Sequence, residues 1–277
     1  MIKTSEHGPV TVIRMGRSIG RFVLYPVHAF LVGDTMIDTG APCVRRELAS
    51  VLEGRIIRTV INTHQHEDHI GGNDLLQGHF GARVLAPAGA LPVLKNPRLL
   101  KLRPYQRVVW GWPAPSDADP LPGVVQAGPY ALKVIPSPGH TPHHVCLHEP
   151  REGWLFTGDL FCGRGFKYLR ADENYSLIVE TLGMLAGLDF GTIFCSLLGA
   201  VDNGRDALRE KVRFMEDLSA LVLDLHDKGL PPREISKRLL GGEGAMGPVT
   251  GGHYSKLNTV LSIIHNMEPE NIDNKKQ

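Results

Sequence analysis

A run of six residues, HQHEDH at positions 64–69, constrains this chain more than any other feature. It follows residues 56–61, a short apolar run that predicts a buried strand. Side chains two positions apart point the same way in an extended segment, so His64 and His66 can hold one ion. The last two residues of the run come where a helix is expected to start, and they can turn toward a second ion. Because imidazole and carboxylate groups suit Zn²⁺, Fe or Mn²⁺, the run predicts a transition-metal site.

A solvated loop that happens to be rich in histidine is the plain alternative. Eight of the thirteen histidines lie in two short clusters, within 64–79 and 140–148. Histidines on an ordinary surface scatter, whereas these gather at polar turns rich in glycine. The first cluster is also internal to the chain, between a predicted strand and a Gly-Gly helix start. Metal ligands are therefore the better interpretation.

Length, charge and cysteine usage narrow the class of protein. The 277 residues suit one large α/β domain, or one domain with a small appendage. A formal net charge of +1 gives no bulk attraction to nucleic acid or to an anionic membrane. The sequence MIKTSEHGPV lacks the apolar core of a signal peptide, and no two cysteines are spaced CxxC. We expect a cytoplasmic protein with a small-molecule substrate and no nucleic-acid or membrane partner; whether it forms a homodimer stays open.

The order of predicted elements indicates two stacked sheets flanked by helices, because strands followed by one or two helices occur twice in succession. Apolar periodicity and glycine or proline breaks give the boundaries. Strands are predicted at 11–15, 22–34, 35–40, 56–61, 82–87, 130–138, 143–149, 152–161 and 191–198, and helices at 42–53, 69–80, 90–102 and 176–188.

The texture of the chain changes at two places. Eight of the twenty prolines fall between Pro87 and Pro122, and since proline breaks regular elements, we expect an irregular flap over 88–130. From about Gly204 apolar residues recur at helical spacing. We therefore predict a main domain over 1–205 and a C-terminal helical region, 206–277, packed on it.

Four motifs also occur in an order that is typical of one family. They are MIDTG at 36–40, HxHxDH at 64–69, PGHTP at 138–142 and FTGD at 156–159. Together they resemble the metallo-β-lactamase superfamily over residues 8–205. The resemblance implies an α/β (α+β) fold, a four-layer αββα metallo-β-lactamase-type sandwich, here with a C-terminal helical appendage. Within that superfamily the chain is similar to the hydroxyacylglutathione hydrolase, or glyoxalase II-like, branch.

The same resemblance implies a set of metal ligands and a role for zinc, bound as one or two ions, with Fe or Mn²⁺ as alternatives. Asp38 takes the place of a residue that orients ligands, and His144 that of a supporting histidine. The six implied ligands are His64, His66 and His140 for a first ion, Asp68 and His69 for a second, and Asp159 as a bridge.

The implied chemistry is hydrolysis. The resemblance implies that two ions, about 3.5–4 Å apart, would activate a water for attack on a carbonyl or phosphoryl centre. The second ion would stabilise the developing oxyanion. Asp68 is the candidate catalytic residue, because it can carry the proton to the leaving group.

One position departs from the family pattern. A last histidine ligand is expected in the stretch that here reads Cys195-Ser196-Leu197-Leu198-Gly199, and the leucine at 197 cannot bind a metal. His143, His253 or water are the open substitutes at the second ion.

Two hypotheses of different class follow. The first is a metal-dependent hydrolase of a small ester-type substrate, either a thioester such as an acylglutathione or a lactone, by attack of a metal-bound hydroxide. The second is a catalytically degenerate family member that binds metal and a metabolite or partner without turnover, and Leu197 motivates it.

The missing histidine predicts unequal metal sites. We expect one firmly held ion and a second that is only partly occupied, because the second site has lost a ligand. Metal analysis of the purified protein after dialysis measures this. Two equivalents of tightly held metal would contradict the prediction.

Overall fold

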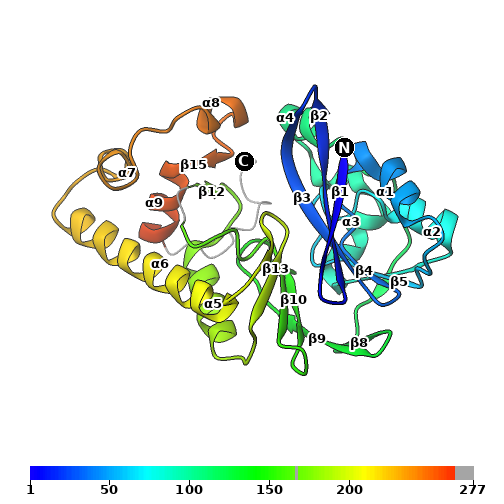
Figure 1. The fold of residues 1–277 in the computed structure, drawn as a ribbon. Helices are drawn as coiled ribbons and strands as arrows, with labels where there is room; N and C mark the ends of the chain where they lie inside the picture. Colours follow the sequence, from blue (N-terminus) through cyan, green and yellow to red (C-terminus); the bar gives the residue numbers. More distant parts are fainter. Residues whose placement is uncertain (166–167, 266–277) are drawn as a thin grey trace. The chain divides into compact units, whose positions relative to one another are not determined.

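A computed structural model describes residues 1–165 and 168–265 (Figure 1). The chain forms two compact units. Unit 1 comprises residues 1–137, 143–162 and 189–205, and unit 2 comprises residues 138–142, 163–188 and 206–277. The part of the predicted C-terminal region at 266–277 lies outside the described residues.

The first sheet of unit 1 has seven strands in the order β1 to β7. β1 to β4 are antiparallel neighbours, whereas β4 to β7 run parallel. Figure 1 shows β1 to β3 in blue as the long strands of this sheet. The bounds are β1 (Ile2–His7), β2 (Val10–Ile19), β3 (Phe22–Val32), β4 (Thr35–Ile37), β5 (Thr59–Ile61), β6 (Arg83–Ala86) and β7 (Asp119–Pro120).

The second sheet of unit 1 has six strands in the order β14-β13-β11-β10-β9-β8. All its neighbours are antiparallel except β11 and β13, which run parallel. The bounds are β8 (Val124–Ala127), β9 (Tyr130–Pro136), β10 (Val145–Glu149), β11 (Trp154–Gly158), β13 (Thr192–Cys195) and β14 (Gly199–Val201).

Alternation along the strands divides the core of unit 1 into two layers. In β3, Phe30 and Val32 face the second sheet, where they join Phe156 and Phe194. Their neighbours in sequence face the opposite way and join the helices that cover the first sheet. This period of two is what a pleated strand buried on both faces requires. The covering helices are α1 (Arg45–Leu52), α2 (Asn73–Phe80) and α3 (Leu91–Lys95).

The proline-rich segment is more regular than the predicted flap. It contains short 3-10 helices at Ala88–Ala90 and Pro97–Leu100, besides α3 and α4 (Pro104–Val109). Proline stands at the first or second position of α3 and α4, where its missing N–H costs no hydrogen bond. Leu94 and Trp110 are buried in the core of the first sheet, which ties the segment to that core.

Unit 2 is mainly helical. Its helix α9 packs against α5 and α7, and against the short strand β12. The Glu243 carboxylate accepts hydrogen bonds from the backbone N–H groups of Lys256 and Leu257, which begin α9, so it caps that helix. None of the helices in the described part of the chain has the length and apolar character to cross a membrane. The bounds are β12 (Leu169–Arg170), α5 (Tyr175–Ala186), α6 (Gly204–Asp227), which begins in unit 1, α7 (Pro232–Leu240), α8 (Met246–Thr250), β15 (Tyr254–Ser255) and α9 (Lys256–His265).

The helix predicted from His69 begins later, at Asn73. The carbonyl of His69 explains the delay, because other groups occupy it. It accepts hydrogen bonds from the backbone N–H of Thr39 at 2.8 Å and the side-chain amide of Asn62 at 3.2 Å. Residues 67–72 therefore form turns, and this part of the sequence-based prediction is wrong.

Gly71 lets these turns lie against the end of β4. A Cβ atom built on Gly71 would stand 2.2 Å from the backbone nitrogen of Pro42 and 2.5 Å from the carbonyl oxygen of Gly40. Both are backbone atoms, so no side-chain rotation relieves the overlap. Glycine is needed here for close approach rather than for an unusual torsion angle.

We predict that Gly71→Ala lowers the free energy of unfolding by about 1–3 kcal/mol, the usual cost of overpacking. Gly78→Ala is the matched control, because it lies within α2 with nothing near the added Cβ. It should raise stability by about 0.5–1 kcal/mol through helix propensity. Urea unfolding followed by circular dichroism measures both changes, and equal stability of the two variants would contradict the prediction.

Candidate metal centre

The candidate site of unit 1 lies where parallel strands end. β4 and β5 end side by side, with Ile37 paired to Ile61, and Asp38 and the HQHEDH run follow them. β11 ends at Gly158, which is paired to Cys195 of β13, and Asp159 follows. The carboxyl ends of neighbouring parallel strands meet at one edge of a sheet, so the topology gathers these polar residues.

Asp38 organises the first part of the site. Its carboxylate accepts hydrogen bonds from the backbone N–H and the hydroxyl of Thr63, both at 2.8 Å. A hydroxyl has one proton to donate, so Thr63 Oγ1 accepts from Nδ1–H of His64 at 3.0 Å. This arrangement leaves Nε2 of His64 as the ring nitrogen that could bind a metal, as expected when a second group holds the other ring nitrogen.

Three potential ligands come together around that nitrogen. His64 Nε2 lies 2.8 Å from Nδ1 of His66. His64, His66 and Asp159 each offer an atom, and these atoms lie within 4.8 Å of one another. The two imidazoles are buried and the aspartate is partly buried. Imidazole nitrogen and carboxylate oxygen are donor atoms that zinc takes, so this group could hold a metal ion.

His69 supplies the test of whether this donor set fits a cation. Its Nδ1–H donates a hydrogen bond to Asp38 Oδ2 at 2.8 Å. Its Nε2 is buried without a hydrogen-bond partner among the described residues, although Asp159 Oδ1 stands 3.1 Å away. In a neutral imidazole the lone pair of this nitrogen would face a carboxylate oxygen and repel it, so the pair requires positive charge, supplied by a proton on Nε2 or by a metal ion. The residues present therefore fit a metal ion.

The pKa values of His69 and Asp68 are both raised, which indicates that positive charge is favoured at this place. Burial alone would lower the pKa of His69, but the Asp159 and Asp38 carboxylates raise it well above its usual value. Burial raises the pKa of Asp68 to about 7, with Glu67 and Asp159 adding to the rise and His69 opposing it. Asp68 Oδ1 lies 4.0 Å from His69 Nε2. Carboxylates thus crowd a place that a cation would neutralise.

Asp159 is positioned by the end of β11. Gly158 has φ of 48°, and a Cβ there would meet His144 at 2.6 Å and Thr63 at 2.8 Å. The backbone N–H of Asp159 donates to Nε2 of His144 at 3.3 Å, and Nδ1 of His144 bonds the Ser137 hydroxyl at 2.8 Å. His144 thus supports Asp159 through its backbone.

His140 belongs to unit 2 and is described there. Its Nδ1 bonds Oε1 of Glu173 at 2.5 Å, and the other oxygen of Glu173 accepts the backbone N–H of Arg170 at 2.6 Å. A carboxylate on Nδ1 fixes the ring and leaves Nε2 as the donor atom for a metal.

The two histidines considered as substitutes for the missing ligand have other neighbours. His143 is exposed, and its ring lies so close to Gly89 that a Cβ there would stand 2.3 Å from it. In unit 2, His253 lies 3.6 Å from Asp172. Leu197 is 38% exposed in the turn between β13 and β14.

Sequence reasoning missed several residues that hold the site. Thr63 directly precedes the candidate ligand His64, and Ser196 directly precedes Leu197, so their places in the sequence were a signal that could have revealed them. Glu173 lies 33 positions from its partner His140, and no local pattern links the two. Gln106 of α4 donates a hydrogen bond to the buried Glu67 at 2.7 Å, an interaction that only tertiary structure reveals.

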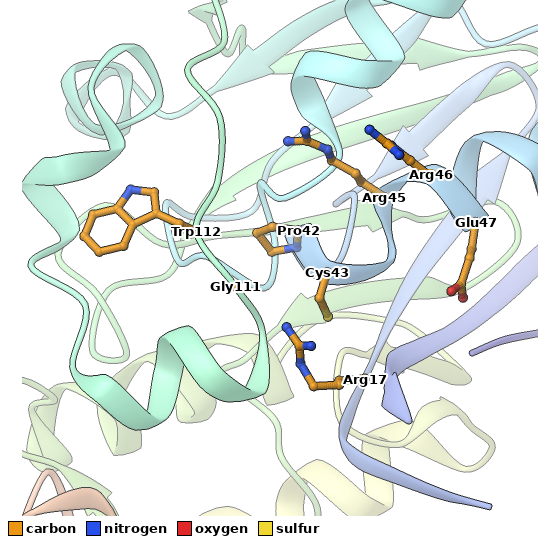
Figure 2. A pocket seen from close by; sticks show the side chains of 8 residues that line it. All are labelled: Arg17, Pro42, Cys43, Arg45, Arg46, Glu47, Gly111 and Trp112. Atoms are coloured by element: carbon orange, nitrogen blue, oxygen red, sulfur yellow. The ribbon is translucent and has the colours of Figure 1, made fainter. Parts of the chain in front are cut away.

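Unit 1 also has a hollow lined by three arginines. It has a volume of about 440 Å³ and is lined by α1, β2 and the chain after α4. Figure 2 shows Arg17 reaching toward Cys43 from one side, with Arg45 and Arg46 extending from α1. None of its lining residues belongs to the six candidate ligands, so this basic hollow is chemically distinct from the acidic metal centre.

Comparison with known proteins identifies the class. The family model of the metallo-beta-lactamase superfamily matches residues 23–196. The match covers more than half of the chain, and its motifs end the strands just described. The protein belongs to the metallo-beta-lactamase superfamily, and the resemblance noted in its sequence is confirmed.

Particular relatives point to one branch. A hydroxyacylglutathione hydrolase from Maricaulis maris is 34% identical over 160 residues, covering 56% of this chain and 54% of that protein. Another, from Rhodobacter capsulatus, is 30% identical over 246 residues, covering 84% of this chain and 82% of that protein. The first match thus spans about half of the relative's length. The chain is therefore a superfamily member with glyoxalase II-like relatives.

Solved structures confirm the predicted fold class. A beta-lactamase domain protein from Burkholderia ambifaria has a TM-score of 0.69 at 18% identity, covering 95% of this chain and 88% of that chain. A metallo-beta-lactamase family protein from Thermus thermophilus has a TM-score of 0.65 at 19% identity, covering 94% of this chain and 96% of that chain. At such identity the likeness shows the fold alone.

We predict that Gln106→Leu destabilises the metal-free protein by about 1–3 kcal/mol, because it leaves the Glu67 carboxylate buried without its donor. Glu67 is 1% exposed, and its second oxygen already has no partner among the described residues. Gln77→Leu is the matched control, since its hydrogen bond to the Asp117 carbonyl is exposed and should cost little. Chemical denaturation in the presence of a chelator measures both variants; a loss confined to Gln77→Leu would refute the prediction.

Proposed function

We propose that this protein is a metal-dependent hydrolase of a small ester-type substrate, either a thioester such as an acylglutathione or a lactone. The observation that carries the proposal is His69, whose buried Nε2 faces the Asp159 carboxylate with no hydrogen bond among the described residues. The names of the curated relatives, which are hydroxyacylglutathione hydrolases, favour the thioester.

The proposed ligands are the six residues that the sequence indicates. His140 completes the first set with His64, His66 and Asp159. This role for His140 follows from the PGHTP motif at 138–142, which resembles the second histidine motif of the family. Asp68 and His69 would then serve a second ion.

The bound metal would supply a Lewis acid and an activated water. The chain's own residues orient the proposed ligands and carry protons. Asp38 holds Thr63 and His69, and through Thr63 it fixes the ring of His64. Asp68 is the proposed proton carrier, because its carboxylate is partly exposed beside His69 Nε2.

Several finer features belong to the same proposal. Zinc is the proposed metal, since imidazole and carboxylate donors suit it, with Fe or Mn²⁺ as alternatives. A reducing cytoplasm is the proposed location, because none of the four cysteines forms a disulfide in the described part of the chain. We also propose that residues 206–277 form a C-terminal region that helps to bind the substrate, and that the protein acts on a small molecule, as a monomer or a homodimer.

The test is an assay of the purified protein with added Zn²⁺ or Mn²⁺ on a panel of thioesters, lactones and phosphodiesters. We expect metal-dependent hydrolysis of a thioester or lactone. His66→Ala should reduce it by at least about 100-fold, because one ligand of the first ion is lost. His79→Ala is the matched control, since His79 is exposed and is not one of the proposed ligands.

Absence of metal-dependent turnover across the panel would favour the alternative, a degenerate relative that binds metal and a metabolite or partner. Leu197 at the expected ligand position is the observation behind that alternative. Equal activity of His66→Ala and the wild type would separate turnover from the proposed centre.

A further inference from the structure

The turn after β13 brings a serine hydroxyl to the bridging aspartate. Ser196 Oγ forms a hydrogen bond with Oδ1 of Asp159 and lies 3.1 Å from the carbonyl oxygen of Gly158. A hydroxyl donates one proton, and an ionised carboxylate is the stronger acceptor. The hydroxyl of Ser196 therefore donates to Asp159.

The backbone of Ser196 is held from both sides, so its hydroxyl has a fixed direction. Its N–H donates to the Gly158 carbonyl at 3.1 Å. Its carbonyl oxygen accepts from the backbone N–H of His28 at 2.7 Å and bonds Nδ1 of the His28 ring at 2.8 Å. Ser196 is 2% exposed. Hydrogen bonds from His28 of β3 and to Gly158 of β11 thus fix the backbone of Ser196.

We propose that Ser196 is a positioning residue, which holds the Asp159 carboxylate in the orientation that binds metal. The inference rests on the proposed metal centre. Holding one carboxylate oxygen fixes the plane of the group and hence the direction of the other oxygen. An aspartate fixed in advance loses less conformational freedom when an ion arrives.

Ser196 directly precedes Leu197 in the turn after β13. The next residue, Leu197, stands where the family has its last histidine ligand, and its side chain is partly exposed. The turn therefore has no imidazole where the resemblance implies one, and it has a hydroxyl that bonds the proposed ligand Asp159. Ser196 restricts the orientation of the Asp159 carboxylate at a centre whose second ion has fewer ligands.

The test measures metal affinity without any substrate. Zn²⁺ is titrated into metal-free wild type, Ser196→Ala and Ser196→Thr in competition with a chromogenic chelator. We expect Ser196→Ala to weaken zinc binding about 10- to 100-fold, as loss of an orienting partner usually does. Ser196→Thr keeps the hydroxyl and should restore most of the affinity. Leu198→Ala, which truncates an exposed side chain of the same turn, should bind like the wild type.

Two further measurements separate positioning from general damage. The visible spectrum of the Co²⁺-loaded protein should change in Ser196→Ala, because the carboxylate orientation around the ion changes. In a double-mutant cycle, Ser196→Ala should have little further effect on zinc affinity in an Asp159→Asn background. Unfolding of the metal-free variants checks that each is folded.

An unchanged zinc affinity and Co²⁺ spectrum in Ser196→Ala would overturn this inference alone. An effect that is equally large in the Asp159→Asn background would also overturn it, because Ser196 would then act independently of Asp159. A wild type that binds no zinc would overturn the metal centre, and this inference with it. A wild type that binds zinc but hydrolyses nothing would refute the proposed activity and leave the role of Ser196 standing.

Discussion

The arrangement of the candidate metal centre depends on the hydrogen bonds that the Asp38 carboxylate accepts. Asp38 is 3% exposed, and it joins the end of β4 to the loop after β5 through Thr63 and to the last residue of the HQHEDH run through His69. A buried carboxylate is costly unless hydrogen bonds and positive charge compensate it. The loop therefore closes around Asp38, and His64 and His69 take their orientations from that closure.

The same electrostatic logic explains the surroundings of the site. Asp38, Asp68 and Asp159 bring several negative charges to one place, and His69 among them has a raised pKa. Like charges held together destabilise a fold unless a cation is present. A bound cation would relieve this repulsion and would thereby couple folding to metal binding.

Much of the fold could be predicted because it follows local patterns. The apolar residues of β3, β5 and β6 predict those strands, and the HQHEDH run marks the candidate site. The start of α2 could not be predicted, because the carbonyl of His69 is captured by Thr39 and Asn62, which lie on other segments. Glu173, Gln106 and Ser196 escaped for the same reason, since each acts on a partner far away in sequence.

The backbone of Asp38 has a consequence for which residues this position can accept. Its φ is 57°, in the left-handed region that most side chains avoid and that glycine, asparagine and aspartate tolerate. Glutamate keeps the charge but loses the tolerated backbone, whereas asparagine keeps the backbone and loses the charge. Natural drift at this position is thus confined to a narrow choice, and an asparagine found here in a relative would mark a centre whose shape survives while its electrostatic balance has changed.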